Sequence, residues 1–206
     1  AVELLYGEKN PSGKLAETWP KKLSDNPSFL NFPGTEGVVD YAEGVFIGYR
    51  YYDKKEMDVA FPFGYGLSYT TFALSNLQVV KNENGYEVTV DIKNTGKVDG
   101  KEVAQLYISS PVDGIKKPAI ELKAFAKSRN LKPGESQTVK MTVKIDDMEY
   151  FDEASSSWVL DKGTYKFSIG TNAGNIVETK EVEVAEPVVR KVNNVLAPAQ
   201  PIAQEF

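Results

Sequence analysis

The sequence of 206 residues contains neither cysteine nor histidine. These two absences exclude disulfide scaffolds, thiolate and imidazole metal sites, cysteine nucleophiles and Ser-His-Asp triads. No apolar run approaches the length of a membrane span, so a membrane is not an expected partner. Any hydrolytic chemistry in this chain has to rest on carboxylates, and we expect no cofactor.

Basic segments are also lacking, since the net charge is −5 and the lysines are scattered among acidic residues. A phosphate backbone attracts clustered Lys and Arg, so nucleic acid is not an expected partner. No basic stretch followed by an apolar run opens the chain, which favours a cytoplasmic location over secretion. The chain starts without Met, inside a helical pattern that Gly7 ends, so we expect a piece of a longer protein.

Residues 8–66 are rich in Gly, Pro and aromatics, as in Phe61-Pro62-Phe63-Gly64-Tyr65-Gly66. Few stretches in this segment are long enough for a regular element. A segment of this kind cannot build its own core, so we expect it to lie over a neighbouring body. The end of the chain, residues 187–206, is spaced by prolines and is typical of an extended linker or tail, with a helix over 190–196 as an alternative.

From about Tyr69 onward, apolar and polar residues alternate between turn signals such as Asp99-Gly100. This period of two, with no helical period between the stretches, predicts an antiparallel two-sheet sandwich of immunoglobulin or fibronectin type. The predicted strands are 72–80, 86–93, 102–109, 121–130, 136–145, 163–171 and 177–184. The predicted core consists of Val88, Val90, Ile92, Val103, Leu106, Val139, Met141, Val143, Phe167 and Ile169.

Ordered motifs up to about residue 174 make the chain resemble family 3 glycoside hydrolases of the β-glucosidase and β-xylosidase type. The motifs at 10–15, 18–20, 41–53 and 61–72 are similar to the end of the α/β sandwich domain of that family. The motifs at 94–107, 121–125, 131–135 and 150–152 are similar to its fibronectin type III-like domain. The fold class expected from this resemblance is mainly β, a fibronectin type III or immunoglobulin-like β-sandwich preceded by an irregular remnant of an α/β sandwich domain.

The resemblance implies three parts: residues 1–68 as the incomplete end of the α/β sandwich domain, 69–186 as the β-sandwich, and 187–206 as a linker or tail. Family members hydrolyse β-glycosides with retention, using an Asp nucleophile on a (β/α)₈ barrel and a Glu acid/base on the α/β sandwich domain. Both stretches lie outside this chain. The resemblance therefore implies an accessory segment that is inactive alone.

The expected partners are the barrel and the upstream α/β sandwich of the same hydrolase. Through the whole enzyme, the resemblance also implies a small oligosaccharide or β-glucoside substrate. The alternative is an independent carbohydrate-binding or protein-interaction sandwich, an interpretation motivated by the 11 Tyr of the chain. The aromatics concentrate in residues 41–72 and not on one face of the sandwich strands, which counts against that alternative.

Glycoside hydrolysis needs two carboxylates that face one glycosidic bond. Asp146-Asp147 and Asp152-Glu153 are sequence neighbours, so we expect turn or hairpin residues there, not catalytic pairs. The charged residues embedded in the aromatic segment are Glu43, Arg50 and Asp53. We expect them to form an ion pair that braces a loop, with a position next to the sugar-binding pocket as the alternative. An aromatic sugar platform of Phe61, Phe63 and Tyr65 is a further hypothesis.

Overall fold

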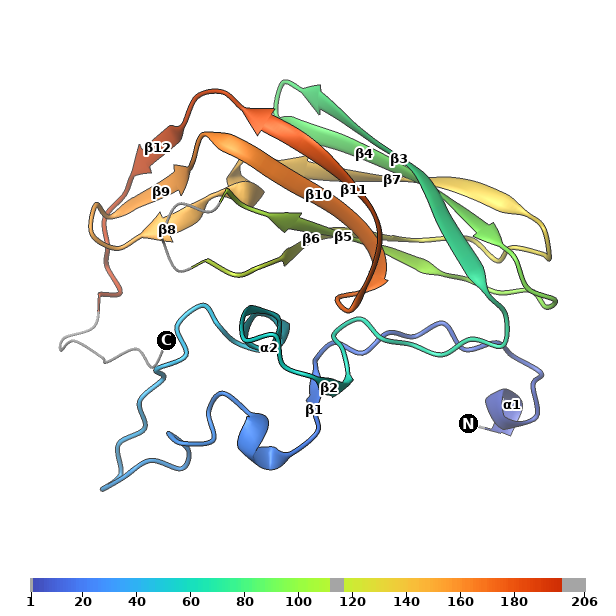
Figure 1. Ribbon diagram of the computed structural model, residues 1–206, viewed down its shortest axis with the longest axis horizontal. Helices are drawn as coiled ribbons and strands as arrows, with labels where there is room; N and C mark the ends of the chain where they lie inside the picture. The colour runs from blue at the N-terminus through green and yellow to red at the C-terminus, as the bar shows by residue number, and fades with distance from the viewer. Residues whose placement is uncertain (1, 112–116, 198–206) are drawn as a thin grey trace.

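The computed structural model describes residues 2–111 and 117–197, and two antiparallel sheets dominate it (Figure 1). One sheet has the order β3-β4-β7 and the other the order β11-β10-β5-β6. The strands of the first are β3 (Phe72–Asn82), β4 (Gly85–Asn94) and β7 (Ser136–Lys144). Those of the second are β5 (Val103–Ser109), β6 (Glu121–Lys127), β10 (Gly163–Asn172) and β11 (Asn175–Val184).

These seven strands correspond to the seven predicted from the alternation, and the predicted sandwich is confirmed. Three short strands were not predicted and form a small sheet in the order β12-β9-β8. They are β8 (Tyr150–Asp152), β9 (Ser157–Leu160) and β12 (Val188–Lys191). Strands of three or four residues are too short for a period of two to stand out in the sequence.

The alternative of a helix over residues 190–196 is wrong. Arg190 and Lys191 belong to β12, where they pair with Trp158 and Ser157 of β9. The Arg190 guanidinium also lies 2.7 Å from the buried Glu149 carboxylate. A strand partner and a charge partner therefore hold this stretch extended.

The space between the two main sheets is filled by one apolar cluster. Nine of the ten predicted core residues are buried, and Val103 is the exception, being only half-buried. The inward residues of β5 are Ala104, Leu106 and Ile108. Because side chains alternate along a strand, Val103 and Leu106, three positions apart, cannot face the same side.

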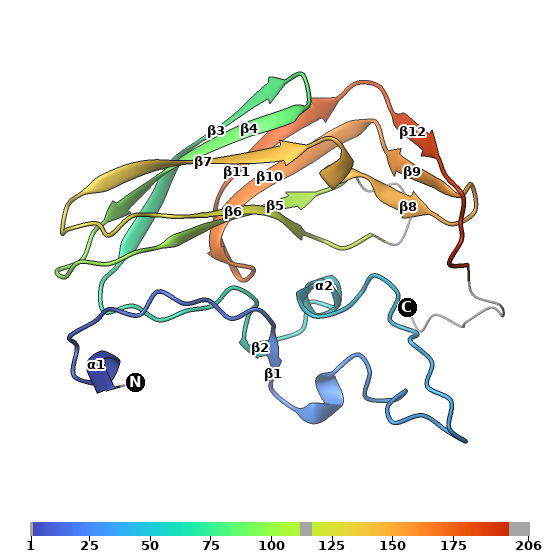
Figure 2. The same ribbon diagram turned by 180° about the vertical axis from the view of Figure 1, so that it is seen from behind.

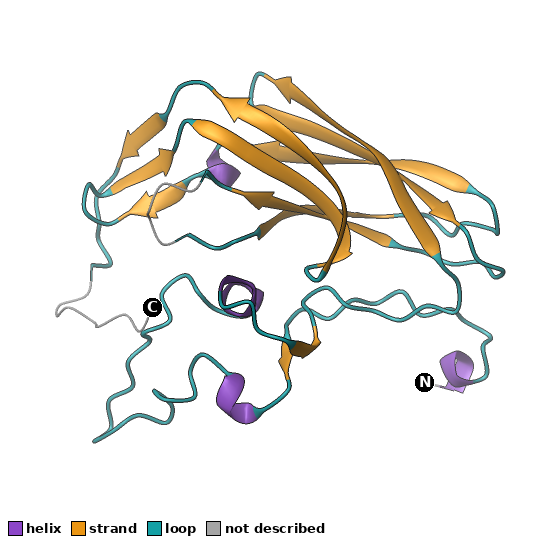
Figure 3. Ribbon diagram, in the orientation of Figure 1, coloured by secondary structure: helices purple, strands orange, loops and turns teal. Residues whose placement is uncertain are grey.

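Residues 2–69 form a layer of mostly loop against the outer face of the four-stranded sheet, on the side away from β3-β4-β7 (Figures 1 and 2). Figure 3 shows how little regular structure this layer contains. Its elements are α1 (Val2–Leu5), β1 (Trp19–Pro20), η1 (Leu23–Asp25), α2 (Tyr49–Lys54) and β2 (Val59–Phe61).

The layer covers the second face of β5, where Gln105 and Tyr107 are as buried as the core residue Leu106 between them. None of the helices in the described part of the chain has the length and apolar character of a membrane crossing.

Candidate functional site

The contact between residues 2–69 and the outer face of the sheet contains a small network of buried polar groups around Gln105 and Tyr107. On this face the Tyr107 hydroxyl donates to Gln105 Oε1 at 2.7 Å. The Gln105 amide in turn donates to the Gly64 carbonyl at 3.1 Å and to the Thr171 carbonyl at 2.6 Å. Burial raises the pKa of the Tyr107 hydroxyl. Gln105 therefore joins the covering layer to two strands of the sheet.

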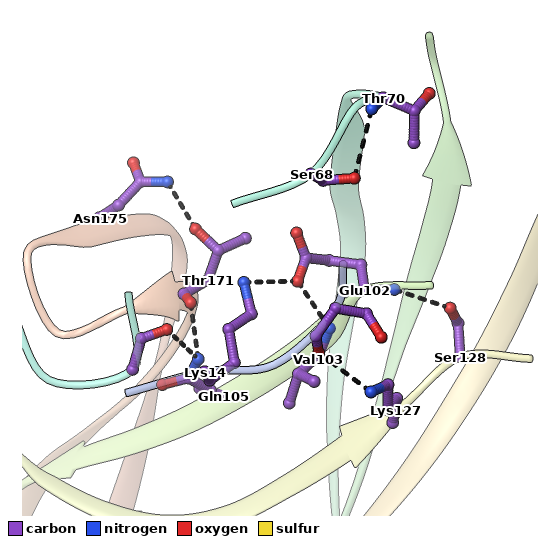
Figure 4. A network of polar contacts seen from close by, with 12 residues as sticks. Lys14, Ser68, Thr70, Glu102, Val103, Gln105, Lys127, Ser128, Thr171 and Asn175 are labelled. Atoms are coloured by element: carbon purple, nitrogen blue, oxygen red, sulfur yellow. Dashed lines mark hydrogen bonds and ion pairs between the residues drawn. The ribbon is translucent and has the colours of Figure 1, made fainter. Parts of the chain in front are cut away.

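A part-buried ion pair adds a second link, close to Gln105 (Figure 4). Lys14 Nζ lies 2.7 Å from Glu102 Oε1, and the same carboxylate oxygen accepts from the Val103 N–H at 2.7 Å. The Lys127 ammonium donates to the Ser12 carbonyl at 2.9 Å. Ser12 and Lys14 are thus fixed to the sheet by Lys127 of β6 and by Glu102, the residue directly before β5.

Helix α2 supplies the aromatic contact to the same face. The ring of Tyr49 stacks on Phe63 with centroids 4.7 Å apart and meets Tyr107 edge-on at 6.1 Å. The Tyr49 hydroxyl accepts from the Leu122 N–H at 2.8 Å. Tyr49 therefore places α2 above the start of β6.

Arg50 lies at this contact, and its partner is not one of the two carboxylates named with it. The guanidinium Nη2 is 3.0 Å from Glu121 Oε1, and Glu121 also pairs with Lys123 at 3.2 Å. Glu43 lies in a turn and is buried with its neighbour Ala42. In the part of the chain that the structure describes, neither Glu43 nor Asp53 forms an ion pair with Arg50.

Asp53 carries a buried carboxylate oxygen, Oδ2, that has no hydrogen-bond partner among the described residues, and the same holds for Arg50 Nε. Loss of hydration raises the pKa of the Asp53 carboxyl to about 6. These two atoms lie on one short helix and leave hydrogen-bonding capacity unused at the edge of the contact.

The remaining acidic neighbours lie in turns. Asp146 and Asp147 belong to the 3₁₀ helix η2 (Asp146–Met148). Asp152 ends β8 and accepts hydrogen bonds from Ser155, which lower the pKa of its carboxyl. Across residues 2–111 and 117–197, no group of three acidic side chains comes together in a way that could hold a metal ion.

The rings of Phe61, Phe63 and Tyr65 do not form one platform. Phe63 faces inward onto Tyr49, whereas Phe61 lies 5.1 Å from Tyr65 and 6.3 Å from Trp19, centroid to centroid. These three outer rings line a pocket of about 390 Å³. The hypothesis of a sugar platform made by the three residues is therefore not supported by their arrangement.

The sequence interpretation missed the groups that join the layer to the sheet, Glu102, Gln105, Tyr107 and Glu121. Each lies in or beside a predicted strand, and its partner is 41 or more residues away in most cases. One signal was present: the stretch 103–108 is apolar at neighbouring positions, which is typical of a strand buried on both faces.

Family models match both regions of the chain. A model described as the glycosyl hydrolase family 3 C-terminal domain matches residues 1–69, and a fibronectin type III-like domain matches residues 102–173. These are the two regions that meet at the contact described above.

Individual relatives agree with these matches. The chain is 44% identical to a β-glucosidase of Kluyveromyces marxianus over 192 residues, which are 92% of this chain and 23% of that protein. It is 41% identical over 182 residues to an exo-α-(1→6)-L-arabinopyranosidase of Bifidobacterium longum, 88% of this chain and 24% of the relative. The solved structure of β-glucosidase 3B from Thermotoga neapolitana with glucose superposes with a TM-score of 0.88 at 42% identity, over 92% of this chain and 27% of that one. The chain thus spans about a quarter of the length of the proteins it matches.

Proposed function

Because the chain belongs to glycoside hydrolase family 3, we propose that it serves as the accessory segment of a β-glucosidase-type enzyme, one that removes terminal β-glucosyl or related glycosyl residues with retention. The acid/base and the nucleophile come from parts of the enzyme outside this chain. The observation that carries the proposal is the match to relatives of which this chain makes up about a quarter.

The sugar is proposed by class only. Relatives of nearly equal identity have the names β-glucosidase and exo-α-(1→6)-L-arabinopyranosidase. A segment that is shared by enzymes with different sugars is expected to serve assembly more than recognition of one sugar. The family-model matches to residues 1–69 and 102–173 support our division into three parts. Residues 1–68 complete the family's α/β sandwich domain, 69–186 form the fibronectin type III-like sandwich, and 187–206 follow it.

We assign Arg50 to bracing and not to the sugar, because its guanidinium pairs with Glu121 of β6, a strand of the sandwich. This pair links α2 to the sheet. It also neutralises the positive charge of Arg50, which is then less able to bind a substrate. Glu43 and Asp53 are assigned to the same loop region, where both are at least half-buried. We expect Glu43 and Asp53 to help shape this loop region, which would lie next to the sugar-binding pocket of the whole enzyme.

The chain alone is expected not to release p-nitrophenol from its β-glucoside above the buffer rate, because a positioned acid and a nucleophile are both required. The complementation partner is the Kluyveromyces marxianus β-glucosidase expressed without the 192 residues that match this chain. Addition of this chain should restore turnover, and the relative's own excised segment is the positive control. If the excised segment restores turnover and this chain does not, the proposed function is wrong.

The Arg50 assignment is tested in the same assay with Arg50→Ala. We expect a lower melting temperature and weaker assembly, with turnover per assembled complex little changed. A fall of about a hundredfold in that turnover, equivalent to about 2.7 kcal/mol of transition-state stabilisation, would instead place Arg50 at the reacting sugar.

A further inference from the structure

A groove crosses the boundary between the layer of residues 2–69 and the sandwich, next to α1 and close to where the chain enters β3 (Figure 1). It consists of two adjoining pockets of about 480 and 420 Å³. The two pockets have three lining residues in common, Glu8, Asn10 and Asp99, so they form one continuous groove. Grooves between two domains are frequent sites for small ligands.

One end of the groove presents two tyrosine rings to solvent. The side chain of Tyr6 is 80% exposed and that of Tyr69 is 55% exposed. The Tyr69 hydroxyl donates to the Leu4 carbonyl at 2.7 Å, which holds this ring at α1. Aromatic side chains combine a large apolar face with a polar tip, and a surface of this kind suits the C–H face of a pyranose ring.

The middle of the groove is held in place by Asn10. The Asn10 amide donates to the Asp99 carbonyl at 2.9 Å, and its Oδ1 accepts from the Ser68 hydroxyl at 3.0 Å and from the Tyr69 N–H at 2.8 Å. These partners lie 58 to 89 positions from Asn10 in the sequence. Because the bonds are internal to the chain, the groove is formed in advance and a ligand does not have to order it.

The carboxylates in the lining have acceptor capacity to spare. The Glu8 carboxylate has no ion pair or side-chain hydrogen bond among the described residues. The Asp99 carboxylate accepts one hydrogen bond, a long one of 3.3 Å from the Asn130 amide. An ionised carboxylate can accept about four hydrogen bonds through its two oxygens, so both groups can accept from the hydroxyls of a ligand.

The charges of the groove favour a neutral ligand over an ion. Its lining contains two ammonium groups, those of Lys9 and Lys101, as well as the carboxylates of Glu8 and Asp99. Lys9 also pairs with Glu3 at 2.7 Å, but both side chains are more than half exposed, and a pair of this kind is weak. Donors and acceptors therefore stand side by side in nearly equal number, which is the combination that a polyhydroxylated molecule needs.

We propose that this groove binds a neutral oligosaccharide, one pyranose ring of which packs on Tyr6 and Tyr69 while its hydroxyls donate to the carboxylates of Glu8 and Asp99. The groove is built entirely from residues of this chain, so the site goes beyond the accessory role and does not depend on it. Contacts of this kind recognise pyranose rings as a class. The site is therefore compatible with a segment whose relatives are named for different sugars.

The first test is titration of the isotope-labelled chain with cellopentaose, a neutral oligosaccharide, followed by amide NMR spectroscopy. The amide resonances of residues 6–10, 69 and 98–101 should shift progressively with concentration, because these residues line the groove. The resonances of β4 and β10 should stay in place, since both strands lie in the sandwich away from the lining.

The second test compares Tyr6→Ala with Tyr41→Ala. The two rings are matched, because both are 80% exposed and belong to the layer, but Tyr41 lies outside the lining of the groove. Neither change removes a buried side chain, so the melting temperature should move little for either variant. Tyr6→Ala should raise the Kd for cellopentaose at least about fivefold, whereas Tyr41→Ala should leave it within about twofold.

Glu8→Gln tests the polar half of the site, because the neutral amide keeps the size of the side chain but accepts fewer and weaker hydrogen bonds. It should raise the Kd for cellopentaose about threefold or more. Spermidine, a small cation with no hydroxyl, is the competing ligand in the same titration. If spermidine shifts the groove resonances and cellopentaose does not, the groove is a cation site and the proposal is overturned.

The proposal is also wrong if millimolar cellopentaose leaves the groove resonances in place, or if Tyr6→Ala and Tyr41→Ala weaken binding equally. These outcomes are distinguishable from failure of the proposed function. A chain that restores turnover in the complementation assay but does not bind cellopentaose in the groove refutes the sugar site alone. A chain that binds cellopentaose there but restores no turnover, while the relative's own segment does, refutes the accessory role alone.

Discussion

The sandwich and the layer of residues 2–69 bury their apolar side chains to very different extents. The sandwich closes a continuous cluster that runs from Leu77 to Val184. In the layer, the buried apolar side chains among the described residues are those of Ala42, Phe46 and Tyr52, while many larger ones remain exposed. Because the layer buries so little apolar surface, it cannot by itself offset the conformational entropy that is lost when its backbone becomes ordered. The sandwich is therefore the body of this chain, and the layer depends on its neighbours.

The largest difference between the sandwich and the layer is expected in the free energy of unfolding when one Leu side chain is truncated in each region. Leu106 is fully buried in the sandwich core, and Leu30 is 79% exposed in the layer. Leu106→Ala should lower the free energy of unfolding by about 2–5 kcal/mol, because a cavity remains where the side chain was. Leu30→Ala should change it by less than about 0.5 kcal/mol.

Urea unfolding of the two Leu variants, followed by far-UV circular dichroism, measures both values. Equal midpoints for Leu106→Ala and the parent would mean that the inward face of β5 has been assigned to the wrong side.

The sandwich could be predicted from the residues because its signal is local. Alternation along β4, β7 and β10 appears within each strand, and turn residues separate the strands. The layer has no such signal. Helix α2 has only six residues and begins after Gly48, whose φ of 54° is a conformation that few other residues adopt readily. A helix this short does not show a period of 3.6.

The partner of Arg50 could not be predicted for a different reason. The sequence places Glu43 and Asp53 close to Arg50, and proximity along the chain suggested the ion pair. The observed partner, Glu121, is 71 positions away and is brought to Arg50 only by the packing of α2 on β6. A tertiary contact of this kind leaves no pattern in one sequence.

A smaller effect is expected from Gly64→Ala, at the joint between the two regions, by which we mean the contact of residues 2–69 with the outer face of the four-stranded sheet. Gly64 has a φ of +80°, and a Cβ at this position would overlap the Gln105 side-chain amide. The backbone strain and the loss of the Gln105 contact should cost about 1–3 kcal/mol. Gly13→Ala is the control, because Gly13 lies on the same layer with no atom within 4 Å of the added carbon.

Hydrogen exchange distinguishes the regions in the Gly64→Ala variant. Amides of residues 2–69 should lose protection, while those of β4 and β10 keep theirs. Loss of protection throughout the chain would show that the layer and the sandwich unfold as one cooperative unit and that the contrast between them is less than we describe.

The smallest effect concerns Asp53, at the edge of the joint. Its carboxyl has a pKa of about 6 in the folded chain against an ordinary value of 3.8, because burial disfavours the charged form. Between these two pH values the folded state holds a proton that the unfolded state has lost, so stability should fall as pH rises from about 4 to about 6. A shift of this size corresponds to about 3 kcal/mol in full, but the side chain keeps some contact with solvent, and about 1 kcal/mol is the expected effect.

Asp53→Asn should therefore raise the free energy of unfolding at pH 7 by about 1 kcal/mol and leave it unchanged near pH 3, since the neutral amide avoids the cost of burying a charge. The control is Asp58→Asn, because the Asp58 side chain is 92% exposed and its pair with Lys21 is open to solvent. Urea midpoints from pH 3 to pH 8 should give a sloping curve for the parent and for Asp58→Asn, and a flatter one for Asp53→Asn. If Asp53→Asn is instead less stable than the parent at pH 7, the Asp53 carboxylate has a partner in the folded chain, and the joint between layer and sandwich is completed by the chain itself and not by the rest of the enzyme.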